Sequence, residues 1–255
     1  MTRRAARRST LALLAAGVFA SAGATVSPSY AANDTAIYIV QGLPGKDLDV
    51  AIDQGPPIAQ DVKAASAAGP FQVTPGSHTV TFSENGETVL ENAFTVKEGS
   101  KADLVAHLLT SSSSDVMVYD KYDAIEVTKG KALFVVTHAA AARPVDIRVN
   151  GQVLFRNIAN GGSSERRVPG GTYEVSVVPA GQAQPVYFGP VDLTVTEGTM
   201  NHIYYVGDPN QETSTIAAKV LAADITGSAR PSLVDTGTGG QASGHGPFFE
   251  VKLAR

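Results

Sequence analysis

The sequence contains two copies of one pattern, and this repeat constrains the fold more than any other feature. Residues 36–53 align without a gap on residues 133–150, at an offset of 97. The alignment continues in two further pairs of segments, 73–80 with 168–175 and 94–99 with 193–198. A copy of this length is a domain, because solenoid repeats are usually half as long or shorter. We therefore expect two tandem domains, over residues 32–129 and 130–226.

Within each copy, apolar and polar residues alternate with a period of two. Leu48, Val50 and Ile52 are separated by Asp or Ala, and the aligned segment 145–150 has the same pattern. Such alternation is typical of a strand with one face in the core and the other in water. The dipeptide Asn150-Gly151 suits the positive φ angles of a tight hairpin. Both copies are therefore predicted to consist of half-buried strands joined by short turns.

About seven short strands are predicted in each copy. In the first copy they cover 37–41, 47–53, 70–74, 78–83, 89–96, 101–109 and 115–119. In the second copy they cover 133–138, 145–150, 153–156, 165–168, 172–178, 186–195, 200–206 and 214–222. Strands at this density, without the Cys and Trp pattern of an antibody domain, favour an all-β fold of two tandem Ig-like β-sandwich domains. A barrel is the alternative architecture.

The N-terminal segment has the pattern of a bacterial export signal. Arg3, Arg4, Arg7 and Arg8 precede an apolar stretch over residues 11–24, which is too short to span a membrane. Ser29-Tyr30-Ala31 then supplies the small residues of a cleavage site. An amphipathic helix fits poorly, because the segment has neither an acidic residue nor a polar face. We expect a signal peptide over residues 1–31, cleaved after Ala31, and a secreted, extracellular protein; the general secretory and twin-arginine routes both remain open.

Composition excludes several classes of protein. The chain has no Cys, which excludes a disulfide framework, a thiolate metal site, a Cys nucleophile and a lipidated Cys anchor. Without residues 1–31 the chain carries 16 Lys and Arg against 24 Asp and Glu, so nucleic acid is not an expected partner. No later stretch reaches about 18 apolar residues, so no transmembrane anchor is expected. Residues 227–255 are rich in Gly, Ser, Thr and Pro and are predicted to be a disordered tail.

Two runs of residues resemble a known family. VTHAAAARPVDIRVNG at 136–151 and VPGGTYEVSVVPAG at 168–181, each repeated more weakly in the first half, are similar to the secreted bacterial modules called domain of unknown function 4397. The resemblance extends over about residues 36–222. The first copy departs from the family pattern, since Gln41 stands where a His is frequent and Asp53-Gln54 replaces the Asn-Gly turn. The resemblance implies export, paired β-sandwiches and association with the cell envelope or its exterior, with no established reaction and no catalytic residues.

The residues themselves give no motif for catalysis. The pattern G-x-S-x-G, which presents a Ser nucleophile on a strained turn, is absent. None of the five His lies in H-E-x-x-H or at a helical i, i+4 spacing. Ser77-His78, and His138 with Asp146, contain the residue types of a triad, but a triad is defined by geometry. We therefore expect no enzyme, no cofactor and no metal site. A secreted hydrolase, or an accessory domain of one, is the alternative.

Two further sets of side chains have more than one interpretation. His138 ends the first strand of the second copy, where a structural hydrogen bond across the loop 139–144 is the first interpretation and a ligand role the second. The carboxylates of Asp47, Asp49 and Asp53, and those of residues 115–126, are expected to be solvated. A calcium site is the alternative for both groups, although neither matches an EF-hand loop.

All five arginines of residues 32–226 lie in the second copy. Arg148 lies on the polar row of its strand, and a turn brings Arg156 beside it. Together with Arg166 and Arg167, these guanidinium groups are the candidate ligand site, for an anionic or glycan polymer of the cell wall. The alternative is a solubilising surface, or ion pairs with the acidic first copy. The sequence thus favours an exported, non-catalytic binding or structural module at the envelope or in the medium.

Overall fold

The structure is a computed structural model that describes residues 35–120 and 125–226. The expected signal peptide at 1–31 and the expected disordered tail at 227–255 lie outside these residues. The described part is nearly all β, and its helical content is one short 3₁₀ turn, η1 (Pro209–Gln211). This confirms the all-β fold class predicted from the alternating pattern.

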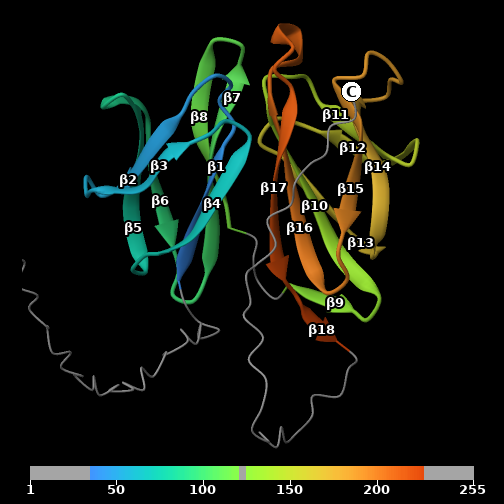
Figure 1. The fold of residues 1–255 in the computed structure, drawn as a ribbon, viewed down its shortest axis with the longest axis horizontal. Coiled ribbons are helices and arrows are strands. Elements are labelled where there is room, and N and C mark those ends of the chain that lie inside the picture. Colours follow the sequence, from blue (N-terminus) through green and yellow to red (C-terminus); the bar gives the residue numbers. More distant parts are fainter. Residues whose placement is uncertain (1–34, 121–124, 227–255) are drawn as a thin grey trace, which may run out of the picture. The chain divides into compact units, whose positions relative to one another are not determined.

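The first copy forms a sandwich of two four-stranded sheets (Figure 1). Its strands are β1 (Ala36–Gln41), β2 (Leu48–Ile52), β3 (Pro57–Val62), β4 (Ser66–Gln72), β5 (Gly76–Glu84), β6 (Glu87–Val96), β7 (Lys101–Thr110) and β8 (Ser113–Tyr119). One sheet has the order β4-β1-β7-β8, and we call it the inner sheet because it packs against the second copy. The other, the outer sheet, has the order β3-β2-β5-β6. The core between them contains Ile37, Leu48, Phe82 and Leu104, all fully buried.

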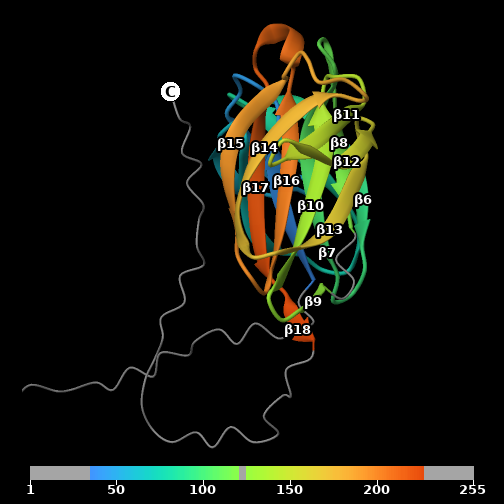
Figure 2. The same cartoon turned by 90° about the vertical axis from the view of Figure 1, so that its right-hand side faces the viewer.

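The second copy repeats this architecture strand for strand (Figure 2). Its strands are β10 (Lys131–Ala140), β11 (Val145–Val149), β12 (Gln152–Ile158), β13 (Ser163–Pro169), β14 (Gly171–Pro179), β15 (Phe188–Val195), β16 (Thr199–Gly207) and β17 (Thr215–Ala222). Its inner sheet is β13-β10-β16-β17, and its outer sheet is β12-β11-β14-β15. The short strands β9 (Glu126–Thr128) and β18 (Asp224–Thr226) pair in parallel beside it. The sequence repeat is therefore a structural repeat, and the predicted pair of β-sandwiches is confirmed.

The strand order sets these sandwiches apart from an antibody domain. β1 lies in the middle of its sheet, antiparallel to β4 and parallel to β7, and β10 has the same position between β13 and β16. In an antibody constant domain the first, second, fourth and fifth strands share a sheet instead. The protein thus shares the sandwich architecture of Ig-like domains but connects its strands differently.

One strand of the first copy is missing from the sequence prediction. β3 (Pro57–Val62) has the sequence PIAQDV and forms the edge of the outer sheet, where most of its side chains are exposed or half-buried. An edge strand has only one neighbour and can be polar, so it lacks the apolar alternation used to find strands. The predicted strand 70–74 likewise begins too late, because β4 starts at Ser66. All eight strands predicted in the second copy are present.

Candidate functional site

The two inner sheets bury their second faces against each other. β1, β10 and β16 are buried at nearly every position, because one row of side chains faces its own sandwich core and the other row faces the opposite inner sheet. Val40 and Val105 of the first sandwich pack there with Tyr204 and Val206 of the second. A Cβ atom on Gly42 would lie 2.8 Å from Val206 Cγ1, so this contact requires glycine. We call this contact the inter-sandwich interface.

A group of polar side chains lies inside this otherwise apolar interface. We call it the interface cluster, and it consists of Tyr38, Asp103, Thr137, His202, Tyr204 and Lys219. Asp103 is 0% exposed and accepts hydrogen bonds from the Tyr204 hydroxyl at one oxygen and from Lys219 Nζ at the other. The ring of Tyr38 covers the ammonium group, with its centroid 4.0 Å from Nζ. A carboxylate and an ammonium group from different sandwiches thus meet with little access to water.

His202 supports this ion pair from the second sandwich. Its Nε2 lies 2.7 Å from Thr137 Oγ1, and its Nδ1 lies 2.9 Å from the Tyr204 hydroxyl oxygen. Complete burial holds the pKa of His202 well below its usual value, and the nearby charge of Lys219 lowers it further. The imidazole is therefore neutral. Since Tyr204 donates to Asp103, the consistent pattern has Nδ1–H donating to Tyr204 and Thr137 donating to Nε2.

Lys219 has an environment that disfavours its charge. Burial lowers the pKa of its ammonium group to about 8, although the adjacent Asp103 carboxylate opposes the shift. Its exposed fraction is 7%. A buried ion pair of this kind stabilises a fold only weakly, because desolvation of both groups offsets much of their attraction. The cluster is therefore not explained as a simple stabilising contact.

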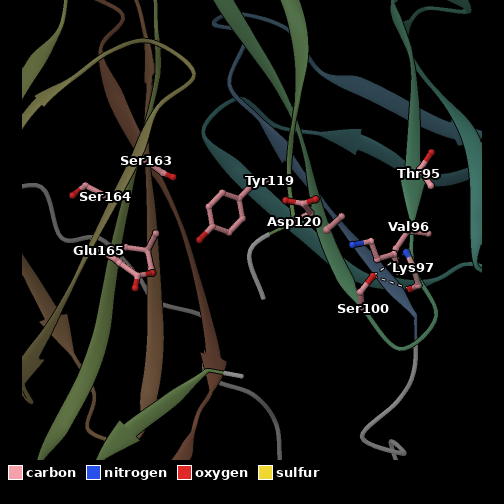
Figure 3. A pocket seen from close by; sticks show the side chains of 11 residues that line it. Thr95, Val96, Lys97, Ser100, Tyr119, Asp120, Ser163, Ser164 and Glu165 are labelled. Atoms are coloured by element: carbon pink, nitrogen blue, oxygen red, sulfur yellow. Dashed lines mark hydrogen bonds between the residues drawn. The ribbon is translucent and has the colours of Figure 1, made fainter. Parts of the chain in front are cut away.

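A pocket of about 670 Å³ opens beside the interface cluster, between residues of both sandwiches. It is lined by Thr95, Val96, Lys97, Ser100 and Ala102 around the β6–β7 turn, by Tyr119 and Asp120 at the end of β8, and by Val135, Ser163, Ser164 and Glu165 of the second sandwich. Figure 3 shows the ring of Tyr119 between the β13 side chains and those of the β6–β7 turn. We call this cavity the interface pocket.

Tyr119 links the interface pocket to the interface cluster. Its ring lines the pocket and meets the ring of His202 edge-on, with centroids 4.5 Å apart. Burial raises the pKa of the Tyr119 hydroxyl, and the carboxylates of Glu165, Asp103 and Asp120 raise it further. Tyr119 therefore stays protonated and can donate a hydrogen bond. The pocket combines hydroxyl groups, two carboxylates, one ammonium group and an aromatic ring.

The four predicted arginines do not form one group. Arg148 on β11 and Arg156 on β12 belong to the outer sheet of the second sandwich, and the Arg148 guanidinium donates to the Gly151 carbonyl oxygen of its own hairpin at 2.9 Å. Arg166 and Arg167 belong to β13, at the edge of the inner sheet. Because they are consecutive in a strand, their side chains leave on opposite faces. Arg167 donates to the Glu126 carbonyl oxygen at 3.1 Å.

His138 has the structural role that was the first interpretation of its position. Its Nε2 lies 3.2 Å from the Arg143 carbonyl oxygen, and its Nδ1 accepts from the Ala140 N–H at 3.2 Å. Burial lowers the pKa of His138 to about 4, so the ring is neutral. Both ring nitrogens are thus occupied by backbone groups, one at the end of β10 and one in the loop that follows it. His138 does not line the interface pocket.

The acidic residues near β2 have local partners. The Asp49 carboxylate accepts from the Asp61 N–H at 3.0 Å, and Asp53 accepts from His78 and from the Thr79 N–H. Within residues 35–120 and 125–226, no three His, Asp or Glu side chains are grouped so that they could hold a metal ion. Asp123 of the second acidic group lies outside the described residues.

No helix in the described part of the chain is long and apolar enough to cross a membrane.

The interface cluster and the interface pocket were not predicted from the sequence. The available signal was a charged residue inside an otherwise apolar strand: Asp103 in KADLVAH, and Lys219 in TIAAKVLA. An ionisable group in a run that is buried on both faces needs a partner from another element.

The comparisons with known proteins agree with the resemblance noted in the sequence. The family model described as Domain of unknown function (DUF4397) matches residues 35–148. This range covers the whole first sandwich together with β10 and most of β11. No curated protein matches the chain.

Proposed function

We propose that the protein is an exported, non-catalytic module that binds a glycan of the cell envelope in the interface pocket. The basic, apolar and small-residue order of residues 1–31 supports export. The chemistry of the pocket supports binding.

The lining of the interface pocket carries this proposal. The hydroxyl groups of Thr95, Ser100, Ser163 and Ser164 can each donate and accept hydrogen bonds, as sugar hydroxyls do. Asp120 and Glu165 add acceptors, and Tyr119 offers an aromatic ring. A volume of about 670 Å³ lies in the range of small-ligand pockets. No His is among the lining residues, so a Ser nucleophile activated by a His has no base in the pocket.

The arginines of the second sandwich offer a second contact for the same polymer. Arg148 and Arg156 lie on neighbouring strands of the outer sheet, where guanidinium groups can bind phosphate or carboxylate groups. Arg166 and Arg167 lie on β13, the strand that also supplies Ser163, Ser164 and Glu165 to the pocket. A long anionic glycan could therefore contact the pocket and the β13 arginines together.

The test is retention of the purified protein on purified cell-wall fractions across a salt series. We expect the pocket variant Glu165→Gln/Asp120→Asn to lose most of its retention at every salt concentration. The variant Arg148→Ala/Arg156→Ala should lose retention mainly at low salt, because exposed charges are screened within about 8 to 10 Å at physiological ionic strength. Lys63→Ala, which removes an exposed lysine paired with Asp47, serves as the control. Equal retention of all four proteins would contradict the proposal.

The same samples test the hydrolase alternative. The two carboxylates of the pocket would then be the acid and the base, and incubation would release soluble sugars with new reducing ends. The binding proposal predicts that no such ends appear and that the bound polymer keeps its length. Release that is lost in Glu165→Gln would replace the binding function with a hydrolytic one.

Export has its own test. We expect the protein in a culture supernatant to begin at Ala32, because Ser29 and Ala31 are the small residues before the cleavage site. Mass spectrometry of the N-terminal peptide measures this directly. A chain that still begins at Met1 would contradict export by this signal.

A further inference from the structure

We propose that Lys219 and Asp103 condense to an intramolecular amide bond that joins the two sandwiches covalently. This inference is independent of the glycan-binding function, because neither residue lines the interface pocket. The amine is on β17 and the carboxyl group is on β7, 116 residues apart in the chain. The fold alone brings them together.

The amine of Lys219 and the carboxyl group of Asp103 are held in contact and have little access to water, which favours condensation between them. Lys219 Nζ contacts Asp103 Oδ1, the Tyr204 hydroxyl contacts Oδ2, and Tyr38 covers the amine. Asp103 is 0% exposed and Lys219 is 7% exposed. Holding two reactants in contact can correspond to an effective concentration of about 10⁵ to 10⁸ M. Condensation of an amine with a carboxylic acid is slow in water, and this site supplies proximity and low access to solvent.

The protons needed for the reaction are already present in the pair. The ion pair and the neutral pair contain the same number of protons, so transfer of one proton from Nζ to Oδ1 needs no external base. Burial of Lys219 favours release of a proton from its ammonium group, because that charge is costly away from water. The low pKa of Lys219, about 8, agrees with this direction. A desolvated lysine amine is a nucleophile.

The condensation then balances within the cluster. Nζ attacks Cγ of Asp103 and forms the new C–N bond, while negative charge develops on Oδ2. The Tyr204 hydroxyl donates to Oδ2 and stabilises this charge, in the manner of an oxyanion hole. A second proton passes from Nζ to the protonated Oδ1, the bond from Cγ to Oδ1 breaks, and one water molecule leaves. The product is a neutral amide that no longer buries two charges.

Such a bond would do for this chain what a disulfide does in many exported domains. The sequence has no Cys, so no disulfide can link the sandwiches. A cross-link between β7 and β17 would close a very long loop and prevent the inner sheets from separating.

The primary test is the intact mass of the purified full chain, with its N-terminus established by peptide mapping. We expect a mass one water molecule lower than the sequence gives. Trypsin should then fail to cleave after Lys219, and the peptide 102–121 should be found joined to 168–252 in one branched product, since Pro231 also blocks cleavage after Arg230. An unshifted mass together with free peptides 102–121 and 168–219 would overturn the proposal.

Matched variants separate the bond from the fold. Lys219→Arg keeps the positive charge but not the amine, and its mass should equal the full sequence mass. Asp103→Asn should condense with loss of ammonia and reach the same final mass as the wild-type protein. Tyr204→Phe should slow the loss of water after refolding by at least tenfold, since it removes the donor to Oδ2. A loss of water that persists unchanged in Lys219→Arg would assign it to another site and overturn the proposal.

Discussion

In each sandwich, one side chain at the end of the first strand makes two hydrogen bonds to the backbone that follows. The two bonds have the same spacing in both sandwiches, but the side chain is Gln41 in the first and His138 in the second. In the first sandwich, Gln41 accepts from the Leu43 N–H at 2.5 Å and donates to the Lys46 carbonyl oxygen at 2.8 Å. In the second, His138 accepts from the residue two positions on and contacts the carbonyl oxygen five positions on, the same spacing. An amide and a neutral imidazole each offer one acceptor and one donor. The fold needs this pair of bonds and tolerates either residue.

A second equivalent pair follows the same rule. Asp53 accepts from the Thr79 N–H at 2.9 Å, and Asn150 at the aligned position accepts from the Glu174 N–H at 2.9 Å. Both residues have positive φ, 52° and 49°, which Asn and Asp adopt more readily than most residues. The contacts that shape the loops are therefore kept between the copies.

The facing sides of the inner sheets have diverged instead. Because β7 pairs with β1 and β16 pairs with β10 in the same register, Asp103 has the position that His202 has in the second copy. Tyr119 and Lys219 are equivalent in the same way. The interface cluster therefore combines different residues from equivalent positions. This difference locates the features specific to the pair of sandwiches at the interface rather than in either core.

Separating the two copies should have the largest effect. We expect residues 32–129 and 130–226 each to fold alone, because each has its own core between its own two sheets. Each half would then expose the interface side of its inner sheet, and the two halves should associate when mixed. Dispersed amide spectra of the isolated halves, and sedimentation of the mixture, measure these outcomes. A half without a dispersed spectrum would mean that the interface is part of a single core.

Replacement of His138 should test whether the loop contacts are interchangeable. His138→Ala should lower the free energy of unfolding by about 2–4 kcal/mol, because it leaves a cavity and two unpaired backbone groups. His138→Gln should lose clearly less, since Gln41 makes the same bonds in the first sandwich. Denaturant unfolding of the three proteins measures the difference. Equal losses in both variants would show that the two loops are not equivalent.

The pH dependence of unfolding sharpens the same comparison. The pKa of His138 is about 4 in the folded state, below its unfolded value of about 6.5, so the unfolded chain binds the extra proton between these values. This contribution to stability is complete above pH 6.5 and is lost as the pH falls towards 4, by about 3 kcal/mol. His138→Gln should flatten this part of the profile. A wild-type slope that persists unchanged in the variant would assign it to His107 or His202, whose pKa values are also lowered by burial.

Replacement of the aligned residues Asp49 and Asp146 should lower the free energy of unfolding by different, smaller amounts. Asp146 is buried and accepts from the Asn157 and Gly181 N–H groups, whereas Asp49 is half-buried and accepts from the Asp61 N–H. Asp146→Ala should therefore cost about 2–3 kcal/mol and Asp49→Ala about 1 kcal/mol. The difference between the two unfolding midpoints checks this order. A larger loss for Asp49→Ala would contradict the order expected from burial.

Sequence patterns predicted the fold far better than the site. The repeat and its alternation of apolar residues located nearly every strand, because in strands such as β2 buried apolar residues alternate with half-buried ones. These patterns did not reveal that the inner sheets are buried on both faces. That fact depends on one sandwich meeting the other, and it is what brings Asp103 to Lys219. The arginines were conspicuous in the sequence because all of them after the first 31 residues lie in the second copy up to residue 226 or in the segment that follows it. The interface cluster was inconspicuous because Asp103 and Lys219 lie in different copies.

The central position of β1 has a consequence for the order of folding. Ala36 pairs with Lys101, so the first strand synthesised lacks its parallel neighbour until β7 is available. β2, β3, β5 and β6 form a sheet without β1, and β5 and β6 are joined by a tight turn. Distant pairings are slow to form because loop closure is costly before the contacts exist. We expect the outer sheet of the first sandwich to form early during chain synthesis and β1 to be added late, as the strand that completes this sandwich.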